Sequence, residues 1–161
     1  MKKLYICTLF LFIAGMIVAQ EKDCSGYKSD NMYFRYTAMG SQEVIYGNHS
    51  KAINESRKMA NISAESELAK MVNSAVNRVA ERMTSEGESY SEMYIDTTLV
   101  STYKYFNGIK TVCQSETKLI GNMYVTYITK EISMDNISDM FYFRNNDERQ
   151  KFRKLLEKEK K

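Results

Sequence analysis

The sequence predicts an α+β fold in which one long amphipathic helix packs on an antiparallel sheet of about four strands, with a short C-terminal helix. Between Lys51 and Ser85 there is no Gly or Pro, and apolar residues recur every three or four positions, as on one face of a helix. Beyond Gly87 the composition changes to β-branched and aromatic residues, which favour strands. A chain of 161 residues is long enough for these elements to share one core.

The first element is a strand. From Met32 to Met39 the residues alternate in polarity, which places Phe34 and Ala38 on one face of a half-buried strand and Arg35 on the other. We expect Gly40 to end this strand.

The long helix follows a break at Gly47-Asn48. A continuous helix over Lys51 to Ser85 would run roughly 50 Å, against about 33 Å for a ten-residue strand, so it either overhangs the sheet or breaks near its start. Its predicted apolar stripe consists of Ala60, Ala64, Leu68, Met71, Val72, Ala75, Val79 and Met83.

Three further strands are predicted after the helix. They cover Glu92 to Tyr105, Ile109 to Ile120 and Met123 to Ile132. Asn107-Gly108 and Gly121-Asn122 separate them, and both dipeptides are typical of hairpin turns. The expected result is an antiparallel meander joined by the strand that precedes the helix.

The final segment, residues 146–161, predicts a basic amphipathic helix. Asn146-Asp147 can cap it, and Phe152, Leu155 and Leu156 form a narrow apolar seam among Lys and Arg side chains. Peripheral contact with anionic lipid headgroups is one use of such a helix. Acidic neighbours dilute its charge and favour a solvated helix that packs on the domain.

Residues 1–19 resemble a secretory signal peptide. Lys2 and Lys3 precede the apolar run Leu4 to Val18, and Ile17-Val18-Ala19 is an acceptable cleavage site. The run of about sixteen residues is shorter than the roughly twenty that a bilayer requires, so we expect no transmembrane span in the mature chain. The predicted organisation is a flexible leader over 20–31, the α+β domain over 32–145 and the C-terminal helix, exported to the bacterial periplasm.

Two cysteines, Cys24 and Cys113, remain after the signal peptide is removed. An exported protein permits a disulfide between them, but two unpaired thiols are equally natural. Lipid anchoring at Cys24 is not expected, because the charged residues Glu21-Lys22-Asp23 stand where a small, apolar lipobox is needed.

Charge and residue types narrow the function. The formal charge of +3 includes Lys2 and Lys3, so the mature chain is close to neutral and does not predict a nucleic-acid partner. With His49 as the only histidine, neither a His-based metal site nor a Ser-His-Asp relay can be closed. We therefore expect no enzyme activity, no catalytic or metal-ligating residues and no cofactor.

One candidate binding surface is a tyrosine-rich face of the sheet. Such a face could bind a small molecule or a glycan, although packing against the helix explains most of these side chains equally well. The residues are Tyr94, Tyr103, Tyr105, Tyr124 and Tyr127.

The order of these elements resembles the bacterial envelope lipoprotein-twenty family and the related amino-terminal domain of flagellar assembly protein T. The likeness lies in the strand closed by Gly40, then Arg57-Lys-Met-Ala60 and Glu67-Leu68-Ala69 on one helix, then Phe106-Asn-Gly-Ile109 and Gly121-Asn-Met-Tyr124-Val125. It implies a small domain with a long helix against an antiparallel sheet, working in the periplasm or at the outer membrane without catalysis. The expected function is thus protein–protein contact in envelope assembly or maintenance.

Overall fold

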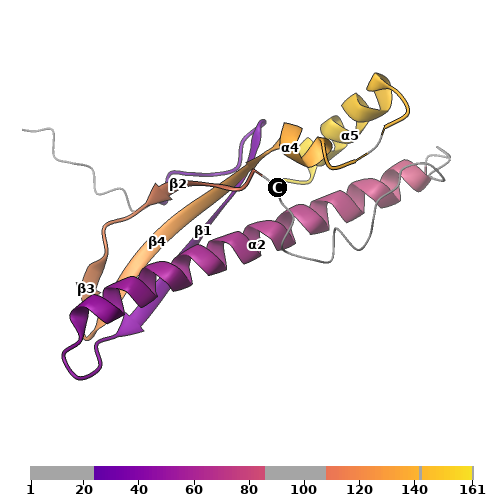
Figure 1. The fold of residues 1–161 in the computed structure, drawn as a ribbon. Coiled ribbons are helices and arrows are strands. Elements are labelled where there is room, and N and C mark those ends of the chain that lie inside the picture. The colour runs from indigo at the N-terminus through magenta and orange to yellow at the C-terminus, as the bar shows by residue number, and fades with distance from the viewer. Residues whose placement is uncertain (1–23, 86–107, 142, 161) are drawn as a thin grey trace, which may run out of the picture.

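The computed structural model describes residues 24–85, 108–141 and 143–160. They form a four-stranded antiparallel sheet, one long helix against a single face of it, and shorter helices at one end (Figure 1). The predicted α+β class, long helix and short C-terminal helix are confirmed. In chain order the elements are β1 (Tyr33–Glu43), α2 (His49–Ser85), β2 (Lys110–Gln114), β3 (Lys118–Ile120), β4 (Met123–Ser133), α4 (Met134–Ser138) and α5 (Asn146–Lys158).

Strand β4 lies at the centre of the sheet. It pairs with β1 along its whole length, from Tyr33 opposite Ser133 to Glu43 opposite Met123, and its other side pairs with β2 and β3. Among the residues that the structure describes, the sheet order β1-β4-β2 makes β1 an edge strand.

The expected strand over Ile109 to Ile120 is two strands, β2 and β3. The interruption falls at Ser115, whose N–H donates to Tyr127 O while its Oγ accepts from Tyr127 N, both at 2.9 Å. Gly121 takes φ 63° in the tight turn between β3 and β4, as its hairpin signal predicts. The expected strand over Glu92 to Tyr105 lies outside the described residues.

Gly40 does not end the first strand, and that expectation was wrong. Strand β1 continues to Glu43, and α2 lies against it at Gly40. A Cβ built there would come within 2.0 Å of Ser56 O and 2.3 Å of Ala60 N. The glycine is required because the helix backbone approaches the strand too closely for a side chain.

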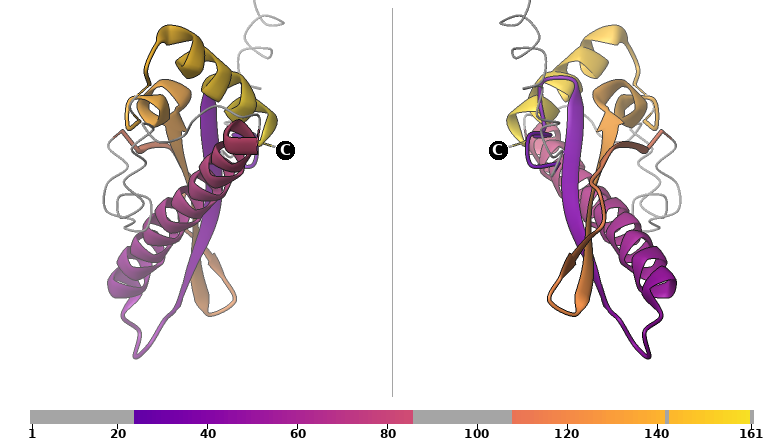
Figure 2. Two further views of the ribbon diagram at one scale, coloured as in Figure 1. Left: turned by 90° about the vertical axis from the view of Figure 1, so that its right-hand side faces the viewer. Right: turned by 90° about the vertical axis from the view of Figure 1, so that its left-hand side faces the viewer.

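Helix α2 is continuous over 37 residues and overhangs the sheet. At about 1.5 Å per residue it is about 55 Å long, well beyond the reach of an 11-residue strand. Figure 2 shows that it runs at an angle to the strands. The predicted stripe is buried except for Met71, which is half-buried, and it begins earlier than expected, at Ala52 and Ser56.

The overhanging part of α2 is covered by α4 and α5. Asn145 is the N-cap of α5, its side chain accepting from Glu148 N, so the cap lies just before the predicted Asn146-Asp147. Phe152 and Leu156 of α5 are fully buried, as the predicted seam implies. With them the main core contains Phe34, Leu68, Val72, Ala75, Val76, Val79, Met83, Ile132, Met134 and Ile137.

The expectation of a flexible leader over 20–31 needs correction from Cys24 onward. Cys24 is buried and forms a disulfide with Cys113 of β2, with the two Cα atoms 5.7 Å apart. Thr37 Oγ1 donates to Cys24 O, and Asp30 Oδ1 accepts from two backbone N–H groups. Residues 24–31 are therefore held against the sheet by tertiary contacts.

Candidate interaction surface

The candidate tyrosines do not form one surface. Tyr94, Tyr103 and Tyr105 lie outside the described residues. Tyr124 and Tyr127 are three residues apart on β4, so their side chains point to opposite faces of the sheet. The Tyr124 hydroxyl lies 3.2 Å from His49 Nδ1 at the start of α2, which places Tyr124 on the helix side.

A charged cluster fixes the segment before β1. Arg35 Nε donates to Glu131 Oε2 at 2.8 Å, and Arg35 Nη1 donates to Asp30 Oδ2 at 2.5 Å and to Lys28 O at 2.8 Å. Hydrogen bonds from the Met32 backbone and from Arg35 hold the pKa of Asp30 below its usual value. The pKa of Arg35 is raised, because its two carboxylate partners outweigh the desolvation that opposes the shift. We call Asp30, Arg35 and Glu131 the Arg35 cluster.

The main-chain groups of β1 alternate between β4 and the outer edge. Met32 O accepts from Met134 N, and Val44 N donates to Asn122 O, so the even-numbered residues face β4. Because an antiparallel edge strand pairs alternate residues, the odd-numbered residues direct their N–H and C=O outward.

This outer edge is closed at its beginning. Asp30 N donates to Tyr33 O, and Ser29 Oγ bonds both the N–H and the C=O of Arg35. Further along β1, within the part of the chain that the structure describes, no group bonds the outward main-chain atoms of Thr37, Met39 and Ser41. Among the described residues, this edge is therefore open from Thr37 to Ser41, and beyond it Glu43 O accepts from Gln42 Nε2 at 3.4 Å.

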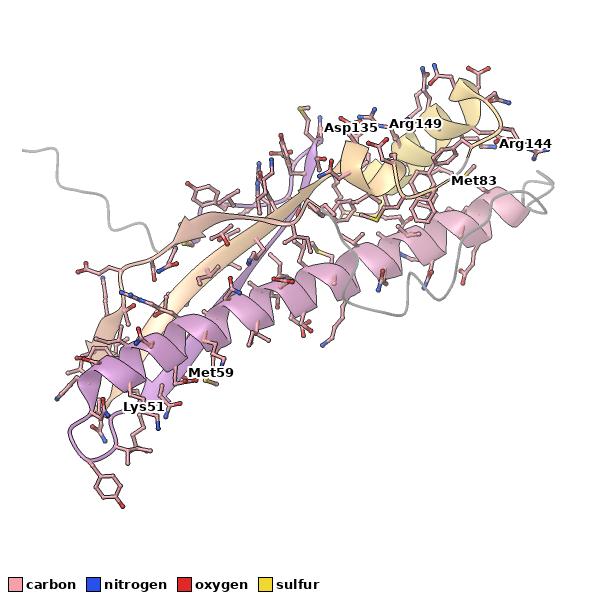
Figure 3. All side chains as sticks on the ribbon, in the orientation of Figure 1. Lys51, Met59, Met83, Asp135, Arg144 and Arg149 are labelled. Atoms are coloured by element: carbon pink, nitrogen blue, oxygen red, sulfur yellow. A yellow bond between two sulfur atoms is a disulfide. The ribbon has the colours of Figure 1, made fainter. Side chains whose placement is uncertain are left out.

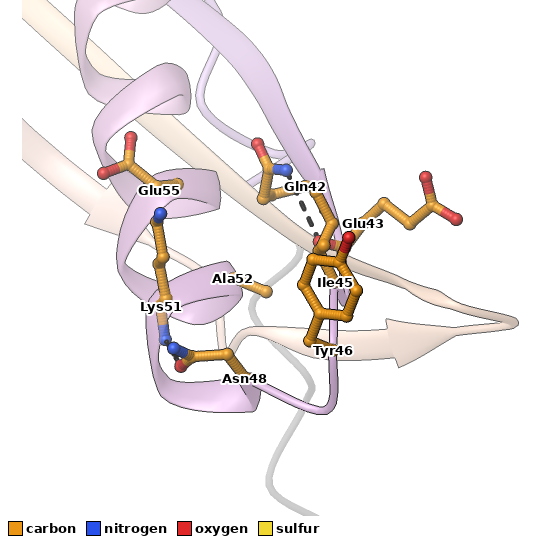
Figure 4. A pocket seen from close by; sticks show the side chains of 8 residues that line it. All are labelled: Gln42, Glu43, Ile45, Tyr46, Asn48, Lys51, Ala52 and Glu55. Atoms are coloured by element: carbon orange, nitrogen blue, oxygen red, sulfur yellow. Dashed lines mark hydrogen bonds between the residues drawn. The ribbon is translucent and has the colours of Figure 1, made fainter.

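A hollow of about 550 Å³ lies where this open edge ends (Figure 4). It is lined by Gln42, Glu43, Ile45, Tyr46, Asn48, Lys51, Ala52 and Glu55. Tyr46 is fully exposed at φ 51°, a left-handed conformation that non-glycine residues seldom adopt, and Gly47 follows at φ 71°. This strained turn holds the aromatic ring in solvent, a feature found more often at functional sites than elsewhere.

Apolar side chains flank the open edge. Met39 is 53% exposed on the sheet face away from α2, and Met59 is 45% exposed on α2. Arg57 Nε donates to Thr117 Oγ1 beside β3. Met59 follows Arg57 by two residues, so its side chain is rotated by about 200° around the helix axis from that of Arg57. It therefore points to the other flank of α2, toward the β1 edge (Figure 3). We call the outer edge from Thr37 to Glu43, Met39, Met59 and the hollow the β1 groove.

Two arginines of α5, and Glu159 just past it, form ion pairs within the domain. Arg153 pairs with Asp135 at 2.8 Å, and Arg149 pairs with Asp139. Glu159, just past the helix, accepts from Arg78 of α2 at 2.5 Å. These contacts support the interpretation of α5 as a helix packed on the domain.

The comparisons with known proteins identify no relative: no protein-family model, curated protein or solved structure matches this chain. Across the described ranges, no helix is both long and apolar enough to span a bilayer. Nor does any group of three or more His, Cys, Asp or Glu side chains within those ranges have the arrangement to hold a metal ion.

Sequence reasoning missed the β1 groove. One usable signal was the run Thr37-Ala-Met-Gly-Ser-Gln42, which continues a strand pattern without charge or proline. The other was Ile45-Tyr46 directly before Gly47, an apolar pair at a turn. That β1 is an edge strand could not be read from the pattern, because edge position depends on the pairing of distant strands.

Proposed function

We propose that this protein is an exported, non-enzymatic domain that acts through protein–protein contacts in the assembly or maintenance of a bacterial envelope. The observation that carries the proposal is the β1 groove. Exposed apolar side chains that adjoin one another mark interaction surfaces, whereas scattered ones do not. Here Met39, Met59, Ile45 and Tyr46 adjoin an open strand edge and a hollow.

The disulfide supports the exported location. Structural disulfides persist in oxidising compartments and are rare in the cytosol. The bond between Cys24 and Cys113 links the segment after the predicted signal peptide to the far side of the sheet. A protein held in this way is suited to the periplasm.

The resemblance to the lipoprotein-twenty family supports the same proposal. The long helix across one face of an antiparallel sheet is the architecture that this resemblance implies. The stretch Arg57-Lys-Met-Ala60 includes Met59 of the β1 groove and Ala60, which packs on β1.

Site-specific cross-linking tests the proposed function. A photoreactive residue replaces Met59 in one variant and Asn77, also exposed on α2, in a matched control. In cells that export the protein, we expect a discrete covalent adduct with one envelope protein from position 59 and none from position 77. Absence of an adduct at 59, or the same adducts from both positions, would contradict the proposal.

A further inference from the structure

We propose that the β1 groove binds an extended segment of a partner protein as an added β-strand, antiparallel to β1, with a basic residue or free amino terminus at the hollow. The inference rests on the proposed function and specifies how the contact is made.

The open edge supplies the main-chain complement of a strand. Thr37, Met39 and Ser41 each direct an N–H and a C=O outward, which is the pattern that strand addition uses. From Thr37 to Glu43 the edge extends about 20 Å at about 3.4 Å per residue, enough for a strand of common length. Natural edges are usually blunted by Lys, Pro or bulges, yet Thr37 to Gln42 has no charge or proline and keeps a regular register with β4.

The two flanks of the edge define the side chains of the added strand. Alternate side chains would point toward the α2 side, where Met59 and Tyr36 are partly exposed, and the others toward Met39 on the opposite face. Each flank carries an exposed apolar side chain near its middle, Met59 on one side and Met39 on the other, so the partner segment should carry apolar residues at its central positions on both faces.

Charge at the hollow indicates the direction in which the partner segment runs along β1. Its lining residues include Glu43 and Glu55 against one cationic residue, Lys51; the Glu43 carboxylate points away from the other lining side chains in Figure 4 and accepts from Asn122 Nδ2 at 2.9 Å. The negative excess favours a positive group on the partner. Because β1 runs toward the hollow, a segment that begins there with its amino end runs antiparallel to β1.

A second copy of this chain fits the edge poorly. The α2 backbone lies directly over β1 at Gly40. Pairing two β1 edges would place two such helices above strands about 4.8 Å apart, whereas packed helices need about 8–10 Å. A single extended segment brings no second helix.

The test is a displayed library of random linear octapeptides with free amino ends, selected against the disulfide-bonded protein. We expect selected peptides to have apolar central positions and Lys or Arg near the amino end. With the best synthetic peptide bound, amide hydrogen exchange should slow at Thr37, Met39 and Ser41. Loss of one main-chain hydrogen bond in Ser41→Pro should weaken binding by about tenfold, whereas Ser41→Ala binds like the wild type.

Since Ser41 N–H points away from β4, proline there leaves the β1–β4 ladder intact, which circular dichroism checks. A second test keeps the protein unchanged and alters only the peptide. N-methylation of every second peptide amide should abolish binding when the methylated amides are those that face β1, and should leave binding intact when they are those that face away. Strand addition would be overturned if no peptides are enriched, or if hydrogen exchange slows at amides other than those of the β1 edge. It would also be overturned if N-methylation has no effect on binding, or if the protein dimerises through β1. A Met59 adduct that persists unchanged in Ser41→Pro would retain the proposed function and reject strand addition.

Discussion

The two ends of α2 pack in different ways. Over the sheet its buried side chains are small and recur every four residues: Ala52, Ser56, Ala60 and Ala64. Toward the other end of α2 most are large, and they join Phe34 of β1 and Phe152 of α5 in a continuous core: Leu68, Val72, Val76, Val79 and Met83, with Ala75 among them. The buried cluster at the sheet end contains only Ala60, Ala64 and Ile128, with Ala38 half-buried beside it.

The difference indicates that the hydrophobic core and the exposed interaction surface lie at different ends of α2. Small side chains bring the helix backbone onto β1 but bury little apolar volume, so other contacts must hold the sheet end. They are the disulfide and a hydroxyl chain in which Thr126 Oγ1 lies 3.0 Å from Ser56 Oγ and 2.9 Å from Thr117 Oγ1. The helical end supplies the hydrophobic core, and the sheet end presents the β1 groove.

Removal of the disulfide should have the largest effect. Replacing Cys24 and Cys113 with alanine opens a loop of 89 residues, so we expect a loss of about 4–5 kcal/mol in the free energy of unfolding. Urea unfolding measures it. Reduction of the wild type should reproduce the loss, and hydrogen exchange should accelerate in β2 and the middle of β4 before α5. If hydrogen exchange accelerated equally at the sheet end and the helical end, the two ends would not be stabilised by separate sets of contacts.

Leu68→Ala should be the next most damaging change. Leu68 is fully buried at the start of the large-residue half, so the lost contacts and the cavity should cost about 3–4 kcal/mol. Met59→Ala is the matched control on the exposed flank of the same helix and should change stability by less than about 0.5 kcal/mol. Similar losses from both variants in chemical denaturation would remove the distinction between the two halves.

Gly40→Ala tests the close approach at the sheet end. The added Cβ would overlap Ser56 O and Ala60 N, which are backbone atoms of α2, so the helix must shift at a cost of about 1–3 kcal/mol. Gly26→Ala is the control, because a Cβ there has no neighbour within 4 Å among the described atoms. A thermal midpoint unchanged by Gly40→Ala would show that the helix does not lie on the strand.

Asp30→Asn should have the smallest effect, with a defined pH dependence. The folded state lowers the pKa of Asp30, so its contribution is complete above the unfolded value and is lost as pH falls through the folded value. Because the carboxylate is about half exposed, we expect a loss of less than about 1 kcal/mol near neutral pH. In urea titrations the variant and the wild type should begin to converge as pH falls below about 4, and the convergence should be complete only below the folded pKa of Asp30; a constant difference would exclude a role for the charge.

The fold was largely predictable because its main signals are long or local. The spacing in α2 repeats over ten turns, and the Gly121 turn is encoded by adjacent residues. The α4 helix was missed because five residues cannot show a period. The leader was misjudged because Cys24 and Asp30 are held by partners far along the chain or by backbone geometry, which composition does not reveal.

The candidate site was less predictable for a related reason. Tyr124 and Tyr127 look like one aromatic set in sequence, yet an odd spacing on one strand separates them. The β1 groove depends on which strand lies at the edge and on where Met59 points, and both follow only from the pairing of β1 with β4 and the contact of Arg57 with Thr117.

The measurement that tests the central claim most directly is the cross-linking yield from position 59 after Tyr46→Ser, compared with Tyr27→Ser as a control on the segment before β1. Tyr46 is fully exposed, so its substitution should leave the free energy of unfolding unchanged within about 0.5 kcal/mol. We predict that Tyr46→Ser lowers the adduct yield by about tenfold, the equivalent of about 1.4 kcal/mol of binding, and that Tyr27→Ser leaves it unchanged. An adduct yield equal to the wild type in Tyr46→Ser would contradict the assignment of the β1 groove as the interaction surface.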